Sequence, residues 1–260
     1  MKKIIFSILL FSFAFIACTK ENTSLPSSIE ISEFHTSSVD ESEFMTEDQY
    51  EFVGLKHNEY LSLMLTTLDL TNSTLTSALS LYDVMNNYDE PYFENYHYDS
   101  NSFLRSDSTA LGILDTSLSD LGKAYLQSAL NAIENFTDVN DFKSNMNQII
   151  TESRLNCTPN DFKILAVICT VFKYSSEFWA PTELGGVGSG YASLLLRHGN
   201  ARIAKPFNWK NALISDGISG GVGCIAVAVG AAIATGPVGW GVLAICAGES
   251  AINSGIAGWL

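Results

Sequence analysis

Basic side chains are scarce in this sequence. Its 260 residues include 14 Lys and Arg against 28 Asp and Glu, which gives a formal net charge of −14. Between residues 20 and 100, only Lys20 and Lys56 are basic. Proteins that bind nucleic acid use clustered Lys and Arg to contact the phosphates. The composition therefore argues against a nucleic-acid partner.

The sequence also has few residues that typically bind metal ions or cofactors. It contains five Cys and four His, and neither a CxxC nor an HExxH motif occurs. None of the histidines lies next to a cysteine in the sequence. The glycine-rich stretch at residues 185–190 lacks the lysine that follows in a phosphate-binding loop. We therefore predict no metal site and no cofactor.

Four of the five cysteines lie in the second half of the chain, at Cys157, Cys169, Cys224 and Cys246. If the protein is exported to an oxidising compartment, these cysteines allow two disulfides, with three pairings that the sequence cannot rank. Each of them also lies among apolar residues, where buried thiols are common. Disulfides and buried thiols therefore both remain open.

One catalytic motif is present in outline. Residues 217–221 match the G-x-S-x-G elbow that places the nucleophilic serine of α/β-hydrolases, here Ser219. That fold needs a strand before the serine and a histidine after it, but all four histidines precede Ser219. His57 lies on an apolar helix face, where a core histidine bonded to a neighbour is the simpler interpretation. We therefore predict no catalytic residues and no enzymatic activity.

The N-terminus predicts export and lipid attachment. Lys2 and Lys3 precede a short apolar stretch at residues 4–16, which is typical of a signal peptide and too short for an ordinary spanning helix. The sequence FIAC, which ends at Cys18, resembles the lipobox of bacterial lipoproteins. This resemblance implies that residues 1–17 are removed and that Cys18 carries a diacylglyceryl group and an acyl chain. Several acyl chains anchor a protein far more firmly than one.

Residues 18–45 are rich in Ser, Thr and acidic side chains and lack apolar periodicity. Such a composition buries too little apolar surface to fold, so we predict a flexible tether between the lipid and the folded part. This tether would give the domain that follows freedom to move relative to the membrane.

Residues 46–180 show apolar side chains at helical spacing. The first pattern includes Val53, His57 and Tyr60. A later pattern, over residues 111–136, is expected to break near Gly122. The last pattern has its apolar face at Phe162, Leu165, Cys169 and Phe172. Strand patterns of comparable quality are absent, and we therefore predict an all-α helical bundle.

Helix starts are predicted from capping residues. Thr46 with Gln49 forms a capping box, and Thr158 is followed by proline, which is favoured in the first turn of a helix. Further starts are predicted at Ser106 or Asp107 and at Thr137.

Residues 181–211 form a glycine-rich hinge followed by a basic segment. A membrane-surface segment typically combines basic residues with tryptophan. An equally good explanation is that these cations pair with the acidic first half of the chain. The candidate membrane-surface residues are Arg197, Arg202, Lys205, Trp209 and Lys210.

Residues 212–260 are rich in Gly and Ala, and residues 217–248 contain no charged side chain. Asp216 is expected to cap the helix that follows. Gly236 and Pro237 divide the uncharged stretch into arms that are each too short to span a bilayer. Small residues recur every four positions, as at Gly217 and Gly221, a spacing that lets helix backbones approach closely. We predict a helical hairpin that turns at Gly236 and Pro237, with its outer face against either lipid or the bundle.

Three features together resemble a group of uncharacterised lipoproteins from Bacteroidetes: the lipobox, the segment GLKHNEYLSLML at residues 54–65, and WKNALISDGISGGVG at residues 209–223. That group has no established activity to transfer. By composition and small-residue spacing alone, the glycine-rich tail is also similar to pore-forming bacteriocins.

We therefore predict an envelope lipoprotein that is anchored by lipid at Cys18, in the outer membrane, and faces the periplasm or the cell surface. Its role is expected to be binding or structural, with a protein partner that the sequence does not identify. The alternative is a membrane-active, toxin-like protein that acts on a bilayer through residues 217–248.

Overall fold

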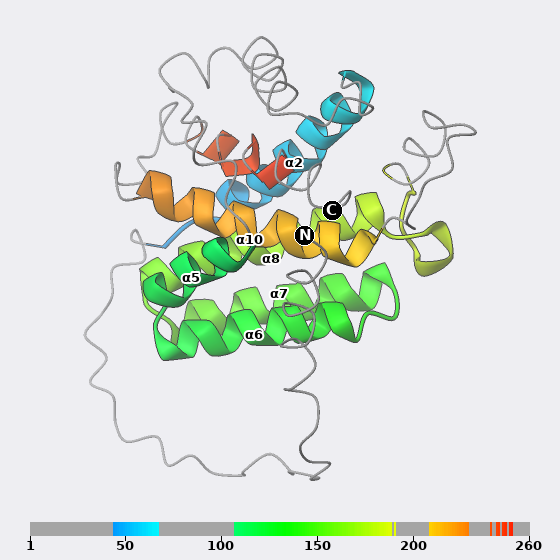
Figure 1. Ribbon diagram of the computed structural model, residues 1–260. Coiled ribbons are helices and arrows are strands. Elements are labelled where there is room, and N and C mark those ends of the chain that lie inside the picture. Colours follow the sequence, from blue (N-terminus) through cyan, green and yellow to red (C-terminus); the bar gives the residue numbers. More distant parts are fainter. Residues whose placement is uncertain are drawn as a thin grey trace, which may run out of the picture. The chain divides into compact units, whose positions relative to one another are not determined.

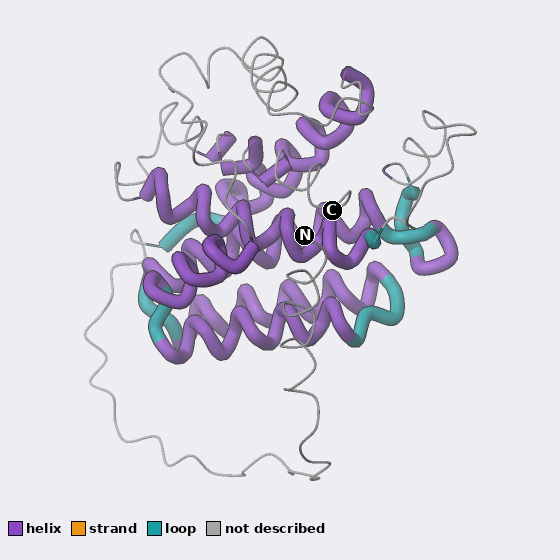
Figure 2. The backbone as a smooth tube through the Cα atoms, viewed as in Figure 1, coloured by secondary structure: helices purple, strands orange, loops and turns teal. Residues whose placement is uncertain are grey.

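The computed structural model describes residues 44–67, 107–188, 190, 208–228, 240, 243–244, 246–248 and 250–251. All of them belong to one compact unit, residues 40–260. Over these residues the chain forms helices, turns and short connections, without any strand (Figures 1 and 2). The all-α fold expected from the sequence is therefore confirmed. Cys18, its signal-like leader, residues 18–43 of the predicted tether and the turn at Gly236 and Pro237 lie outside the described residues.

In chain order the helices are α2 (Glu47–Thr67), α5 (Asp107–Ser117), α6 (Asp120–Glu134), α7 (Val139–Asn156), α8 (Pro159–Trp179), the 3-10 helix η2 (Thr182–Leu184) and α10 (Trp209–Ala228).

Helix α2 begins at the predicted capping box. The Thr46 backbone N–H donates a hydrogen bond to Gln49 Oε1 at 2.9 Å, so a donor at the start of the helix is satisfied by a side chain. The predicted apolar face is buried, with exposed fractions of 0% for Val53, His57 and Tyr60. Helix α2 packs this face against α8.

The helical pattern over residues 111–136 breaks at Leu118 and Ser119, which separate α5 from α6. The predicted break is therefore present, but it lies shortly before Gly122 and not at it. Ser119 Oγ accepts a hydrogen bond from the Gly122 N–H at 3.2 Å and donates one to Asp161 Oδ2 at 2.6 Å. The break thus lies where a serine caps the new helix and a carboxylate of α8 holds that serine.

Helices α7 and α8 start close to the predicted positions. Asp138 caps α7, one residue after the predicted Thr137. Its Oδ1 accepts hydrogen bonds from the backbone N–H groups of Asn140 and Asp141, in the first turn of the helix, at 2.8 and 3.0 Å. Thr158 caps α8 as predicted, with Pro159 in the first turn.

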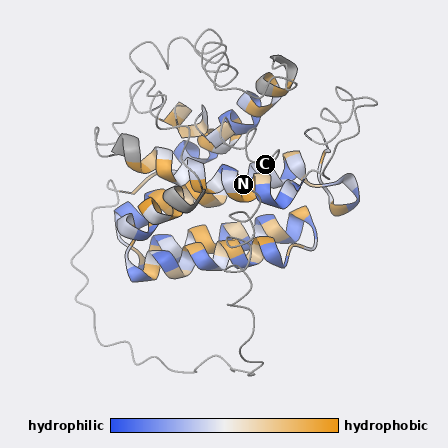
Figure 3. Ribbon diagram, viewed as in Figure 1, coloured by the Kyte–Doolittle hydropathy of each residue, from blue (hydrophilic) through white to orange (hydrophobic). Residues whose placement is uncertain are grey.

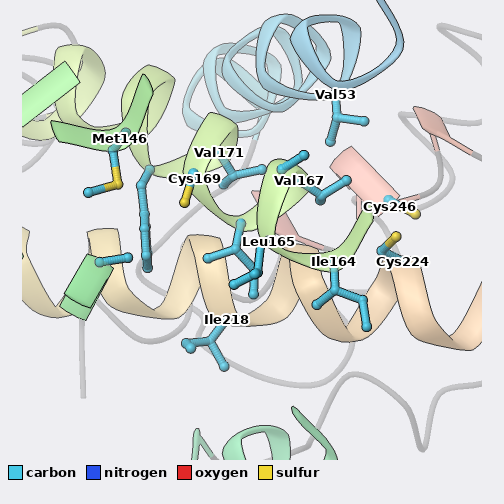
Figure 4. Close-up of a cluster of buried hydrophobic side chains, with 14 of the residues drawn as sticks. Val53, Met146, Ile164, Leu165, Val167, Cys169, Val171, Ile218, Cys224 and Cys246 are labelled. Carbon is cyan, nitrogen blue, oxygen red and sulfur yellow. The ribbon is translucent and has the colours of Figure 1, made fainter. Parts of the chain in front are cut away.

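Helix α8 is the centre of the bundle. It contacts α2, α6, α7 and α10, so nearly all of its surface is covered by other helices. Residues on every side of it are therefore buried, beyond the single apolar face that the sequence pattern indicated. Figure 4 shows side chains of α8 among residues of α2, α7 and α10; the labelled ones of α8 are Ile164, Leu165, Val167, Cys169 and Val171. The outer helices α6 and α7 instead alternate apolar and polar surface (Figure 3).

Helix α10 begins at Trp209 and passes through Asp216 without interruption. The prediction that Asp216 caps the glycine-rich helix was therefore wrong. Asn208 Oδ1 accepts a hydrogen bond from the Asn211 N–H at 3.3 Å at the helix start. Asp216 remains inside the helix because its carboxylate finds partners on α8, which are described below.

Gly217 and Gly221 of α10 face α8. A Cβ added at Gly217 would overlap the Phe172 ring, and one at Gly221 would lie 2.6 Å from Ile168 Cδ1. The small-residue spacing therefore lets α10 approach α8 closely. The side chains from Ser215 to Cys224 are buried on every side. Among the described helices, none is both long enough and apolar enough to cross a membrane.

The glycine-rich segment after α8 turns back on the end of that helix. Gly185 and Gly188 have φ values of 85° and 65°, in the left-handed region that favours glycine. The Val187 N–H donates a hydrogen bond to the Glu177 carbonyl of α8 at 2.8 Å. The described part of the predicted hinge is thus bound to the bundle.

Ser119→Ala is expected to lower the free energy of unfolding by about 2 kcal/mol, because it removes both the α6 cap and the hydrogen bond to Asp161. Urea denaturation followed by circular dichroism measures the change. Ser128→Ala is the control, because Ser128 is an exposed residue of the same helix whose hydroxyl donates only to the Ala124 carbonyl at 3.0 Å. It should change stability by less than about 0.5 kcal/mol. Equal effects of the two variants would contradict the proposed role of Ser119.

Candidate functional site

Five polar side chains from four segments meet inside the bundle. We call them the polar cluster: His57 of α2, Ser175 and Trp179 of α8, Asp216 of α10, and Ser250. Each is at most 1% exposed. Polar groups buried this deeply need partners to offset the loss of water.

Asp216 is at the centre of the polar cluster. Its Oδ2 accepts hydrogen bonds from the Ser175 hydroxyl and, at 3.0 Å, from Trp179 Nε1–H. Its backbone carbonyl accepts a third hydrogen bond, from Ser250 Oγ at 2.5 Å. Asp216 therefore joins α10 to α8 and to the segment that contains Ser250.

His57 faces the other carboxylate oxygen, with its Nε2 3.6 Å from Asp216 Oδ1. Its Nδ1 lies 3.2 Å from Asn58 Oδ1, and Asn58 Nδ2 donates to the Tyr174 carbonyl at 2.8 Å. Because the second contact orients the amide, Asn58 presents an acceptor to His57, and Nδ1 carries a proton. Nε2 then faces Asp216 Oδ1, and neither atom has a hydrogen-bond partner within the described part of the chain.

The Asp216 carboxyl group lies beside the His57 imidazole in a fully buried position. Burial raises the pKa of Asp216, while the His57 imidazole and the hydrogen bonds from Ser175 and Trp179 partly offset that rise. A buried carboxylate without these partners would be an uncompensated charge in an apolar interior, which is costly.

A second polar contact between α2 and α8 lies beside the polar cluster. Lys173 Nζ donates to Glu51 Oε1 at 2.5 Å, and the Tyr174 hydroxyl donates to Glu51 Oε2 at 2.9 Å. Burial, reinforced by the contact with Glu51, raises the pKa of Tyr174, so the phenol keeps its proton. This contact joins α2 to α8, whereas the His57–Asp216 pair joins α2 to α10.

The polar cluster is closed to solvent: His57 and Asp216 are both 0% exposed. A substrate cannot reach either side chain in this conformation. In this conformation the polar cluster connects helices α2, α8 and α10.

The G-x-S-x-G motif has a different geometry from a nucleophile elbow. Ser219 is 9% exposed and lies within α10, one turn after Asp216, without a strand before it among the described residues. An elbow needs a sharp turn between a strand and a helix to expose the serine. The glycines of this motif serve helix packing against α8 instead.

Two of the candidate membrane-surface residues lie in the described part of the chain, and they contact the end of α6 and the connection that follows it. The Trp209 ring packs edge-on against Phe136, with ring centroids 4.9 Å apart. Lys210 Nζ donates to the Glu134 carbonyl at 3.1 Å, at the negative C-terminal end of α6. Arg197, Arg202 and Lys205 lie outside the described residues.

Four cysteines are described, and the structure forms no disulfide among them. Cys169, Cys224 and Cys246 are buried in the core, and Cys157 is half-buried (Figure 4 labels the first three). Burial raises the pKa of Cys169 and of Cys224 to about 12 and that of Cys157 to about 11. At neutral pH these three residues are thiols, which are poor nucleophiles and poor metal ligands.

An open groove lies on the surface between α6 and α7, with a volume of about 420 Å³. Helix α6 lines it with Tyr125, Ser128, Asn131 and Ala132, and its C-cap residue Asn135 adds to the same wall. Helix α7 lines it with Asn145, Gln148, Ile149 and Glu152. The sequence analysis missed this groove. Its amides lie on the solvent side of two amphipathic helices, where polar residues are expected in any case.

No protein-family model, curated protein or solved structure matches this chain. Proposals about its function therefore depend on its own residues and geometry.

Proposed function

We propose that the protein is a lipid-anchored lipoprotein of the bacterial cell envelope with a non-enzymatic binding or structural role. The anchor is the lipidated Cys18, placed by the lipobox at the end of an export signal. The tether at residues 18–45 then separates the bilayer from the helical bundle. This arrangement gives a location in the outer membrane, facing the periplasm or the cell surface.

The observation that carries the proposal is the packing of the glycine-rich helix. Gly217 and Gly221 place α10 against α8, and the intervening polar residue, Ser219, is also buried. A helix used in this way belongs to the core of the bundle. Attachment to the membrane is then left to the lipid at Cys18.

The non-enzymatic role is supported by the closed polar cluster. Its ionisable pair, His57 and Asp216, is fully buried and engaged between helices. Its neighbour Ser219 is held inside α10. The α6–α7 groove, by contrast, is open to solvent and offers a surface for binding.

Membrane fractionation of cells that express the full chain tests this proposal. The wild-type protein should remain with the membrane pellet after carbonate washing, and Cys18→Ala should be released, because lipid supplies the attachment. Cys157→Ala is the control, since it removes another cysteine outside the lipobox. Intact mass should show acyl chains on the wild type and on Cys157→Ala only.

Purified full-length Cys18→Ala should leave dye-filled vesicles of anionic phospholipid intact. Vesicle leakage by this variant, or its retention in the carbonate-washed pellet, would contradict the proposal. Either result would favour the alternative in which residues 217–248 act on a bilayer.

A further inference from the structure

The α6–α7 groove is lined by amide side chains whose orientation is set by neighbouring residues. Gln127 Nε2 donates to Asn131 Oδ1 at 2.9 Å, which leaves both Asn131 Nδ2–H groups for a ligand. Asn135 Nδ2 donates to the Asn131 carbonyl at 2.8 Å, so Asn135 Oδ1 remains an acceptor. This side of the groove therefore offers both donors and acceptors.

Helix α7, on the other side of the groove, also presents polar side chains that can accept or donate hydrogen bonds. Gln148 Nε2 donates to Glu152 Oε1 at 2.8 Å, which leaves Gln148 Oε1 and Glu152 Oε2 as acceptors. Asn145 is exposed on α7, one turn before Gln148, and its side-chain amide adds a donor and an acceptor to this wall. The two walls together can exchange hydrogen bonds with a chain that lies between them.

A ligand that carries hydroxyl groups matches the two sides of the groove best. Each hydroxyl both donates and accepts a hydrogen bond, as an amide side chain does. Among the described residues that line the groove, Glu152 is the only charged one and none is a cation. An anionic ligand would lack a charge partner there and would meet the −14 net charge of the chain. The ligand that fits is polar and uncharged.

The apolar part of the lining also suits a sugar chain. The half-buried Tyr125 accepts a hydrogen bond from Asn156 Nδ2 at 3.2 Å, which fixes one end of its ring. Burial raises the pKa of Tyr125, so its hydroxyl stays protonated. Ala132 and Ile149 form a small apolar floor that matches the C–H face of a sugar ring. An extended peptide would need deeper pockets for alternate side chains.

We propose that the α6–α7 groove binds an uncharged oligosaccharide chain. This inference rests on the proposed function, since it names the ligand class for the binding role of the lipoprotein. The volume of about 420 Å³ is within the range of ligand sites, roughly 300–1,000 Å³. The groove takes a short stretch of glycan, with amides on both sides and Tyr125 at one end.

Isothermal titration calorimetry of the full chain in detergent tests the inference. The probes are a tetramer of N-acetylglucosamine, a neutral glucan tetramer, an anionic tetramer of galacturonic acid and an uncharged extended peptide. We expect binding of at least one neutral sugar. Asn145→Ala and Gln148→Ala should each weaken it about tenfold, as expected for one lost polar contact. Asn147→Ala should change the affinity less than twofold, because Asn147 is exposed on α7 outside the groove.

Three results would overturn the inference: neither neutral sugar binds at millimolar concentration, the groove variants bind as well as the wild type, or the anionic sugar or the peptide binds more tightly. Thermal melting should confirm that these exposed substitutions leave the fold intact. Membrane fractionation of Asn145→Ala separates the two proposals, because retention in the pellet tests the lipid anchor and is independent of sugar binding.

Discussion

Gly217→Ala is expected to lower the free energy of unfolding by about 3 kcal/mol. The added Cβ would overlap the ring of Phe172, which is fully buried on α8 and cannot move aside without displacing its neighbours. Overpacking of a well-packed core typically costs about 1–3 kcal/mol. The upper end is expected here, because the clash lies between two helix backbones that pack closely. Urea denaturation at neutral pH measures the effect.

Gly112→Ala is the matched control, since it makes the same change within helix α5. A Cβ added at Gly112 meets nothing within 4 Å. Alanine favours a helix over glycine by roughly 0.5–1 kcal/mol, so this variant should be more stable than the wild type. The two substitutions should therefore have opposite signs. A stabilising effect of Gly217→Ala would show that α10 does not pack on α8 in solution.

His57→Leu is expected to lower the free energy of unfolding by about 3–5 kcal/mol at neutral pH. The substitution removes the imidazole that faces Asp216 Oδ1 and leaves a buried carboxylate without its counterpart. Because burial raises the pKa of Asp216 and His57 partly offsets that rise, removing His57 raises this pKa further. The effect can be followed by denaturation over a range of pH.

The sign of the pH dependence follows from proton binding. Above the unfolded Asp pKa of about 4 and up to the raised folded pKa, the folded state of His57→Leu binds more protons than the unfolded state. The stability of this variant should therefore be greatest at low pH and should fall as pH rises through that window. Its deficit relative to the wild type should grow accordingly.

The double variant His57→Leu with Asp216→Asn provides the control. An amide at position 216 can still accept the hydrogen bonds from Ser175 and Trp179, but it does not titrate. The extra loss of stability with rising pH should disappear in this variant. If His57→Leu shows the same pH profile as the double variant, His57 does not interact with a titrating Asp216.

Helix starts were largely predictable, because a cap depends on residues close in sequence. The capping box of Thr46 and Gln49 and the proline after Thr158 both mark helix starts in the structure. The break between α5 and α6 was misplaced because it depends on Asp161, which comes from α8. A local pattern contains no information about such a distant partner.

The candidate sites were harder to predict. The sequence placed His57 correctly on a buried face, yet assigned Asp216 to a helix cap. The available signal was an acid at the edge of an uncharged stretch and a histidine on an apolar helix face, in segments distant in the chain. Their pairing depends on how α2 and α10 pack on α8, which a single sequence does not specify. The α6–α7 groove gave no such signal, since exposed amides are common on helices.

The sequence by itself determined the all-α class, the starts of several helices and the buried face of α2, because caps and apolar spacing act within a few turns of one helix. Only the tertiary structure decided that α8 is buried on all sides, that the glycines of α10 pack against it, and that Asp216 lies opposite His57. These features depend on contacts between residues far apart in the chain, and such contacts form only when whole helix faces are matched to one another.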